Sequence, residues 1–234
     1  MDIQFMWETF LILLTGVPLT LELAVTSIFA GGLFALVLSL LAVVGGPIGH
    51  GFTRGYVFVF RGSPLLVQMF LIYYGLGQFR PFLQDIGFWP ILREPYWCAV
   101  IALTLNTAAY TSEIFRGGLQ AVSVQQIEAA RACGMSGPLL FRRIVLPIAI
   151  RHALPAYGNE VILMLKATAL ASVITIMEIT GLAGKLIADS FRAFEVFIVA
   201  GAIYLAITFL VTRLMMIVEF WLSPHLHMRP PTLA

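Results

Sequence analysis

Residues 23–49 read LAVTSIFAGGLFALVLSLLAVVGGPIG and contain no charged side chain. An uncharged run of this length is typical of a helix that crosses a bilayer, which needs about 20 mostly apolar residues. The whole chain has the same character: 60% of its 234 residues are hydrophobic and 11% are charged. Because a soluble domain is about 25% charged, the composition excludes a soluble enzyme, a disordered regulator and a secreted disulfide scaffold.

Similar apolar stretches recur along the chain and predict an all-α, polytopic integral membrane protein that forms one domain, 1–234. A short interfacial helix is expected over about 3–15, because Gly16 and Pro18 interrupt the first apolar run. Loops are expected over 45–51 and 80–95, and a polar segment outside the membrane over about 117–152. The five transmembrane helices are expected over about 18–44, 55–78, 95–116, 155–177 and 195–221.

Lysine and arginine are distributed unevenly between the two sides of these spans. One side has nine, which are Arg54, Arg61, Arg116, Arg131, Arg142, Arg143, Arg151, Arg213 and Arg229. The other side has four, which are Arg80, Arg93, Lys185 and Arg192. Since positive loops stay in the cytoplasm, this bias predicts an N-terminus outside and a C-terminus in the cytoplasm.

The polar segment contains EAARACGMSGPLLFRRIVLP at 128–147, which predicts a helix–turn–helix outside the membrane. Gly134 suits the end of its first helix, where a positive φ is easiest for glycine. Pro147 is expected to end the second helix. The residue types alone would also fit an ordinary amphipathic cytoplasmic loop.

The full spacing E-A-A-x3-G-x9-I-x-L-P resembles the ATPase-coupling motif of the permease subunits of bacterial ABC importers. The seven matching positions are Glu128, Ala129, Ala130, Gly134, Ile144, Leu146 and Pro147. Three further stretches, at 60–75, 105–122 and 154–174, resemble signatures of the polar amino acid permeases. They read FRGSPLLVQMFLIYYG, LNTAAYTSEIFRGGLQAV and LPAYGNEVILMLKATALASVI. The chain most resembles the M-type permease of the histidine/lysine/arginine/ornithine and octopine/nopaline group.

This resemblance implies a permease subunit of an importer for polar, basic amino acids or opines. The implied partners are a second, different permease subunit that completes the pore, a cytoplasmic ATPase dimer and an external substrate-binding protein. No catalytic residue, metal site or cofactor is expected in this chain, which lacks the GxxxxGK[ST] pattern of an ATPase. ATP and Mg²⁺ are expected on the separate ATPase.

Ionisable residues inside spans usually face a cavity or a partner. The resemblance places Glu160, beside Asn159, on the translocation path, where its carboxylate could pair with a basic amino acid. A structural ion pair with a neighbouring helix is the alternative. Lys166 lies about 120° around the helix from Glu160 and could bind a substrate carboxylate or hold a helix interface. Related permeases often carry Asp after this lysine, whereas this chain has Ala167.

Other polar residues in the spans also have two interpretations. Asn106 could contact ligand or bond to another helix, because an amide in the membrane needs partners. Glu113 and Arg116 are spaced to form a structural pair on one helix face. Glu22 is expected at the outer interface. Residues 61–64, RGSP, indicate either a kinked start of the second span or a part of the inner gate.

Two functions of another kind are alternatives to a transporter subunit. An intramembrane enzyme would need a nucleophile or a metal inside the bilayer, and the sequence has neither HExxH nor GxSxG. A channel or a non-transport membrane scaffold subunit remains as the alternative. Neither would need the coupling motif.

Overall fold

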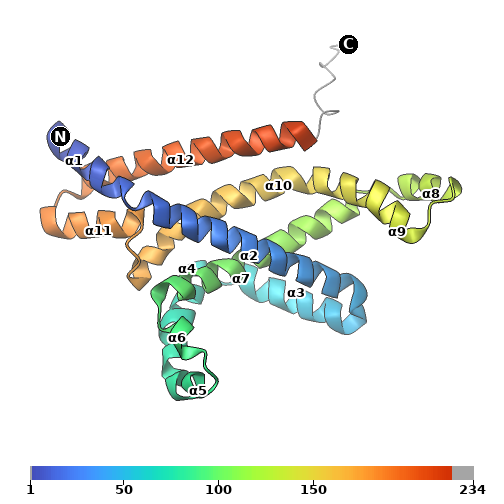
Figure 1. The fold of residues 1–234 in the computed structure, drawn as a ribbon, viewed down its shortest axis with the longest axis horizontal. Helices are drawn as coiled ribbons and strands as arrows, with labels where there is room; N and C mark the ends of the chain where they lie inside the picture. Colours follow the sequence, from blue (N-terminus) through green and yellow to red (C-terminus); the bar gives the residue numbers. More distant parts are fainter. Residues whose placement is uncertain (1, 223–234) are drawn as a thin grey trace, which may run out of the picture.

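The computed structural model describes residues 2–222. Arg229, one of the nine cations counted on the cytoplasmic side, lies outside the described residues. Within that range every regular element is helical. Long helices lie side by side along one direction, and the N-terminus and helix α8 lie at opposite ends of the molecule (Figure 1). The long helices are α2 (Val17–Val44), α7 (Pro95–Gln120), α10 (Leu146–Ala167) and α12 (Ala193–Leu222).

Four helical stretches are long and apolar enough to cross a membrane. They are Ile3–Val44, Pro95–Gln120, Gly137–Ile174 and Ala193–Leu222. A fifth candidate consists of Gly46–Gly62 and Leu65–Asp85, which meet at an angle of 102°. The all-α, multi-span fold class is therefore confirmed, with five spans if the bent pair counts as one.

The loop predicted over 45–51 is wrong, because helix α3 (Gly46–Gly62) occupies most of it. Pro47 lies in the first turn of α3, where its fixed φ suits a helix and its missing N–H costs nothing. Gly46 and Pro47 were predicted to lie in a loop, but they begin a helix.

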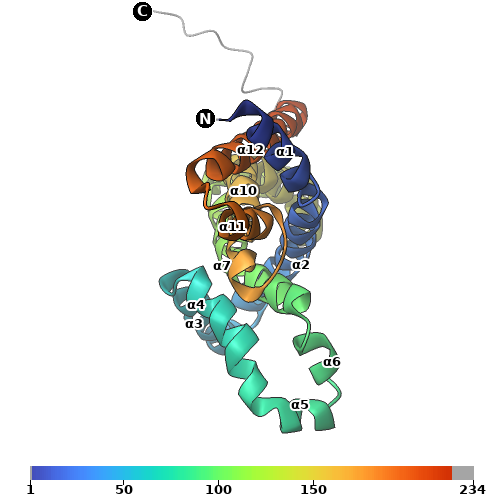
Figure 2. The ribbon, with the colours of Figure 1, turned by 90° about the vertical axis from the view of Figure 1, so that its left-hand side faces the viewer.

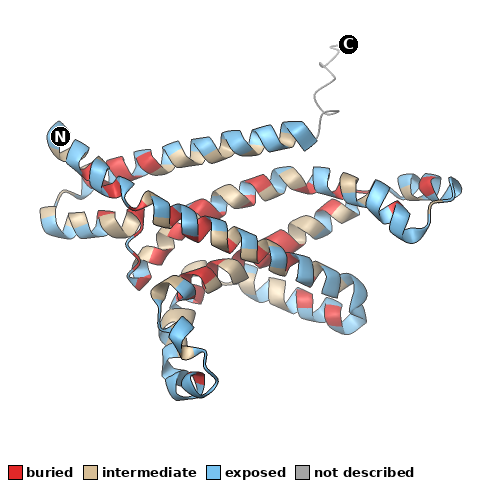
Figure 3. Ribbon diagram, viewed as in Figure 1, coloured by how far each residue is buried: buried red, intermediate tan, exposed pale blue. Residues whose placement is uncertain are grey.

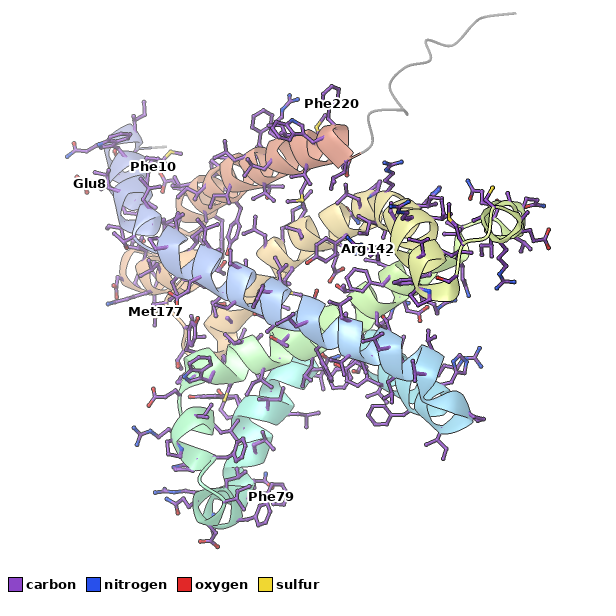
Figure 4. The ribbon with its side chains drawn as sticks, turned by 45° about the vertical axis from the view of Figure 1, so that its right-hand side comes forward. Glu8, Phe10, Phe79, Arg142, Met177 and Phe220 are labelled. Carbon is purple, nitrogen blue, oxygen red and sulfur yellow. The ribbon has the colours of Figure 1, made fainter. Side chains whose placement is uncertain are left out.

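Beyond the bend the chain forms a hairpin that stands away from the body (Figure 2). Its first arm is α4 (Leu65–Phe70), which continues into a π-helical turn and a 3₁₀ turn. Phe79 lies near its far end (Figure 4). The external loop predicted over 80–95 contains two short helices, α5 (Arg80–Asp85) and α6 (Trp89–Leu92).

The predicted coupling segment, 117–152, contains two short helices, α8 (Val124–Ala132) and α9 (Gly137–Leu140). A π-helical turn, Phe141–Val145, follows α9 and leads directly into α10. The prediction that Pro147 ends the second helix is therefore wrong. Pro147 instead lies directly after the π turn, inside one continuous helical stretch, Gly137–Ile174, where the irregular hydrogen bonding of the π turn accommodates its missing N–H. After α10 the chain forms a 3₁₀ segment, Thr168–Ile174, and then α11 (Ile179–Ser190), which the sequence analysis did not predict.

The N-terminal helix α1 (Ile3–Leu14) is attached to the connection between α11 and α12. Asp2 caps α1 by accepting the backbone N–H groups of Gln4 and Phe5. The Arg192 guanidinium pairs with Asp2 at 3.3 Å and with Glu195 at 3.1 Å. The N–H of Phe5 and the Arg192 side chain lower the pKa of the Asp2 carboxyl.

Small residues let the central helices α2, α7 and α10 approach closely, and the buried residues concentrate there (Figure 3). A Cβ at Gly118 of α7 would lie 2.6 Å from the Ala149 carbonyl oxygen and 2.9 Å from the Ala153 Cβ, both in α10. The two backbones are therefore in contact, as is typical of packed membrane helices.

We expect Gly118→Ala to lower stability by about 1–3 kcal/mol, because the added methyl group overlaps backbone that has no free space to move into. The measurement is the thermal unfolding midpoint of the purified protein in detergent. Gly117→Ala is the matched control, since nothing lies within 4 Å of a Cβ at Gly117. Equal midpoints for the two variants would contradict the close α7–α10 contact.

Candidate functional site

Helix α10 has a different environment on each of its sides. Toward α7, the Glu160 carboxylate accepts a hydrogen bond of 2.8 Å from the Thr107 hydroxyl, and both side chains are buried. Toward α12, Gly158 lies against Met215 and Glu219. These neighbours fix the rotation of α10 about its axis and decide which residues remain uncovered.

The uncovered side of α10 carries three polar residues, His152, Asn159 and Lys166, which we call the polar strip. All three are exposed. They are spaced seven residues apart, so they lie within about 40° of one another around the helix. Polar residues in a membrane span face a partner or a water-filled path rather than lipid. The strip is therefore the side of α10 that best suits contact with a hydrophilic ligand.

The structure brings two of the predicted ligand contacts, Asn159 and Lys166, onto one face and places the other two elsewhere. Glu160 is 6% exposed and lies between α7 and α10, away from the strip. No cation lies within ion-pair distance of it among residues 2–222. His152 was not among the predicted contacts, although its seven-residue spacing from Asn159 was a signal that could have found it.

Asn106 is bonded to another helical segment, at the bend between α3 and α4. Its amide donates to the Phe60 carbonyl at 3.2 Å and to the Gln68 side-chain oxygen at 3.1 Å. The Gln68 amide donates in turn to the Phe60 carbonyl at 2.9 Å and to the Ser63 hydroxyl at 2.9 Å. These four residues, which we call the bend network, satisfy the polar groups freed where the helix breaks.

Arg61 lies beside α7, and Arg116 is part of α7 itself. The Arg61 guanidinium lies 4.9 Å from the centre of the Tyr110 ring. The predicted pair between Glu113 and Arg116 is present, with a closest distance of 2.6 Å. Residues 61–64, for which a kink was one of the two interpretations, contain the break between α3 and α4.

Glu178 is fully buried and was not among the predicted site residues. It caps α11 by accepting the N–H groups of Thr180 at 2.9 Å and Gly181 at 3.0 Å. Its other oxygen accepts a hydrogen bond of 2.7 Å from the Tyr204 hydroxyl of α12. The position directly before α11 was a signal, but glutamate is not among the preferred capping residues. This carboxylate joins α11 to α12 on the side of the molecule away from α8.

The coupling motif divides between two places. Glu128, Ala129 and Gly134 lie on or directly after α8 and are exposed, whereas Ala130 is buried. Gly134 has a φ of +78° and ends α8, as the sequence predicts. The other three positions, Ile144, Leu146 and Pro147, lie in the π turn and the first turn of α10. Because α8 lies at one end of the molecule (Figure 1), its surface is free to contact another protein.

Comparisons with known proteins agree on one family. The model for the family described as binding-protein-dependent transport system inner membrane component matches residues 27–224. The nopaline transport system permease protein NocM of Agrobacterium fabrum is 58% identical over 229 residues, which cover 98% of this chain and 95% of that protein. The octopine transport system permease protein OccM of Rhizobium meliloti is 56% identical over 223 residues, covering 95% and 91% respectively.

A solved structure gives the same result. A chain in the crystal structure of an amino acid ABC transporter with histidines superimposes with a TM-score of 0.83 and 35% sequence identity. The match covers 94% of this chain and 98% of that one.

We expect Gln68→Leu to destabilise the protein by about 1–3 kcal/mol, because buried carbonyl and amide groups at the bend lose their partners. The thermal unfolding midpoint in detergent measures the effect. Val67→Leu is the control, since Val67 is 45% exposed and lies outside the network. A midpoint for Gln68→Leu no lower than that of the control would show that the bend does not depend on these bonds.

Proposed function

Because the chain belongs to the family of binding-protein-dependent transport system inner membrane components, we propose that its polar strip lines the path of a basic amino acid or opine. The chain is a multi-pass permease subunit of an amino acid or opine ABC transporter. The single observation that carries the proposed path is the uncovered face of α10, with Asn159 and Lys166 on it.

The chemistry of this face suits a substrate with carboxylates. Lys166 would bind a carboxylate by a charge-assisted hydrogen bond, and Asn159 would bind polar groups beside it. An opine is a conjugate of an amino acid with a keto acid and so carries more than one carboxylate. Ala167, where related permeases often carry Asp, leaves Lys166 without an adjacent competing acid. A substrate rich in carboxylates fits this arrangement.

Glu160 and Asn106 support the path from behind in this proposal. Glu160 holds α10 against α7 through its hydrogen bond with Thr107, and so sets the direction in which Asn159 and Lys166 face. Asn106 holds the bend that shapes the adjoining wall. Their contributions to binding would be indirect in the conformation described here.

The proposed assembly follows from the family. A second permease subunit, different from this one, would complete the path, and a substrate-binding protein would deliver the ligand outside the inner membrane. A separate ATPase dimer would bind ATP and Mg²⁺ and dock on α8 in the cytoplasm, with the N-terminus of this chain outside. Closure of the ATPases would move α8 and, through the continuous helix into α10, rotate the spans as rigid bodies.

We expect Lys166→Gln to raise the substrate KM for uptake about tenfold or more, because a hydrogen bond to a charged group contributes about 1.5–3 kcal/mol. Uptake is measured with the complete transporter in vesicles. Lys185→Gln is the matched control, since Lys185 is an exposed lysine on α11, outside the strip. The same KM for both variants would contradict a carboxylate contact at Lys166.

Gly134→Ala is expected to reduce ATP-driven uptake several-fold, because alanine is strained at a φ of +78° and the end of α8 would shift. The measurement is substrate transported per ATP hydrolysed. Gly137→Ala serves as the control, because Gly137 has no positive φ and nothing lies within 4 Å of its added Cβ. An unchanged ratio for Gly134→Ala would show that the end of α8 does not transmit the motion.

A further inference from the structure

An apolar groove of about 580 Å³ lies between α2, α7 and α10. Residues of α2 along one side, Leu36, Leu40 and Val43, are exposed, although they line the groove. Leu146 and Ile150 of α10 line the other side and are also exposed. The volume is within the range of small-molecule sites, about 300–1,000 Å³. The groove can therefore accept an elongated apolar group.

This groove is separate from the proposed path. The α10 residues that line it are centred about 150° around the helix from the polar strip. A lining that is apolar apart from Ser39 and Tyr157 offers few polar contacts to a charged amino acid. The occupant must therefore be largely apolar and must lie on the side of α10 away from the ligand.

The end of the groove nearest α8 carries positive charge. Phe141 lines the groove, and Arg142 and Arg143 follow it directly. They precede Leu146 by four and three residues, which places them on its side of the helix. Figure 4 shows Arg142 on the segment that leads into α10. Both arginines are exposed, and no ion pair is made by either within residues 2–222.

We propose that the groove binds one anionic phospholipid, with an acyl chain between α2 and α10 and its phosphate on Arg142 and Arg143. Basic pockets between membrane helices on the cytoplasmic side are suited to such headgroups. The arginine side chains point back along the helix toward this side of the membrane, which lets their charges reach the headgroup level. Two uncompensated cations would be unfavourable against an apolar helix of another permease, so charge complementarity favours the lipid.

The test uses the complete transporter in lipid nanodiscs with a photoreactive acyl chain on phosphatidylglycerol or, for comparison, on phosphatidylcholine. Mass spectrometry of peptides locates the cross-links. Phosphatidylglycerol is expected to label peptides of α2 and α10 at the groove more strongly than phosphatidylcholine does. In the double variant Arg142→Gln/Arg143→Gln this labelling should fall by about 25-fold, from a factor of roughly five per arginine.

Two further variants separate the groove from the charge. Leu40→Trp fills the groove from its rim and should abolish labelling there with both arginines in place. Arg213→Gln, an exposed arginine of α12 outside the groove, should leave labelling unchanged. If the double arginine variant fails to assemble, Leu40→Trp and the comparison of the two lipids still decide the question.

Three results would overturn the proposal. Equal labelling by the two lipids would show that no headgroup is recognised. Unchanged labelling in Leu40→Trp would place the lipid elsewhere. A cysteine introduced at Leu40 that cross-links to the second permease subunit would show that protein occupies the groove.

Discussion

The contact between α7 and α10 determines how the rest of the molecule is used. Gly118 allows the two backbones to touch, and the buried hydrogen bond from Thr107 to Glu160 fixes the rotation of α10. With that rotation set, the polar strip is uncovered on one side and the apolar groove forms on the other. A rotation of α10 by one residue, about 100°, would expose the carboxylate and remove the strip from its open face. The rotation of this one helix thus places a hydrophilic surface on one side and an apolar groove on the other.

Composition and periodicity were enough to predict the class of fold, because a membrane imposes length and polarity on every span. They did not predict where helices start and end around proline. Pro47 was predicted in a loop and lies in the first turn of α3. Pro147 was predicted to end a helix and lies directly after the π turn of a continuous one. The residue type alone does not show whether the backbone at that position needs an N–H donor, which proline lacks.

The candidate site was predicted only in part for a similar reason. Lys166 was predicted because it is ionisable inside a span, and Asn159 because it lies beside Glu160. Helical spacing places both together with His152. Whether Glu160 and Asn106 face ligand or protein depends on neighbours that are distant in the chain, such as Thr107 and Gln68. The roles of Gln68 and Glu178 were not predicted, because their partners Asn106 and Tyr204 belong to other helices. Such pairings become visible only when the helices are packed.

The attachment of α1 to the connection before α12 has a consequence for biosynthesis. Arg192 meets Asp2 across 190 residues of chain, and Leu13 shares a core with Val196. At about 5–20 residues per second, the ribosome needs on the order of 10–40 s to make the intervening chain. During that time α1 has been made but its packing partners have not, so its inner face must be covered by lipid or by an insertion factor. A helix that is made well before its packing partners is thus among the last to reach its final neighbours.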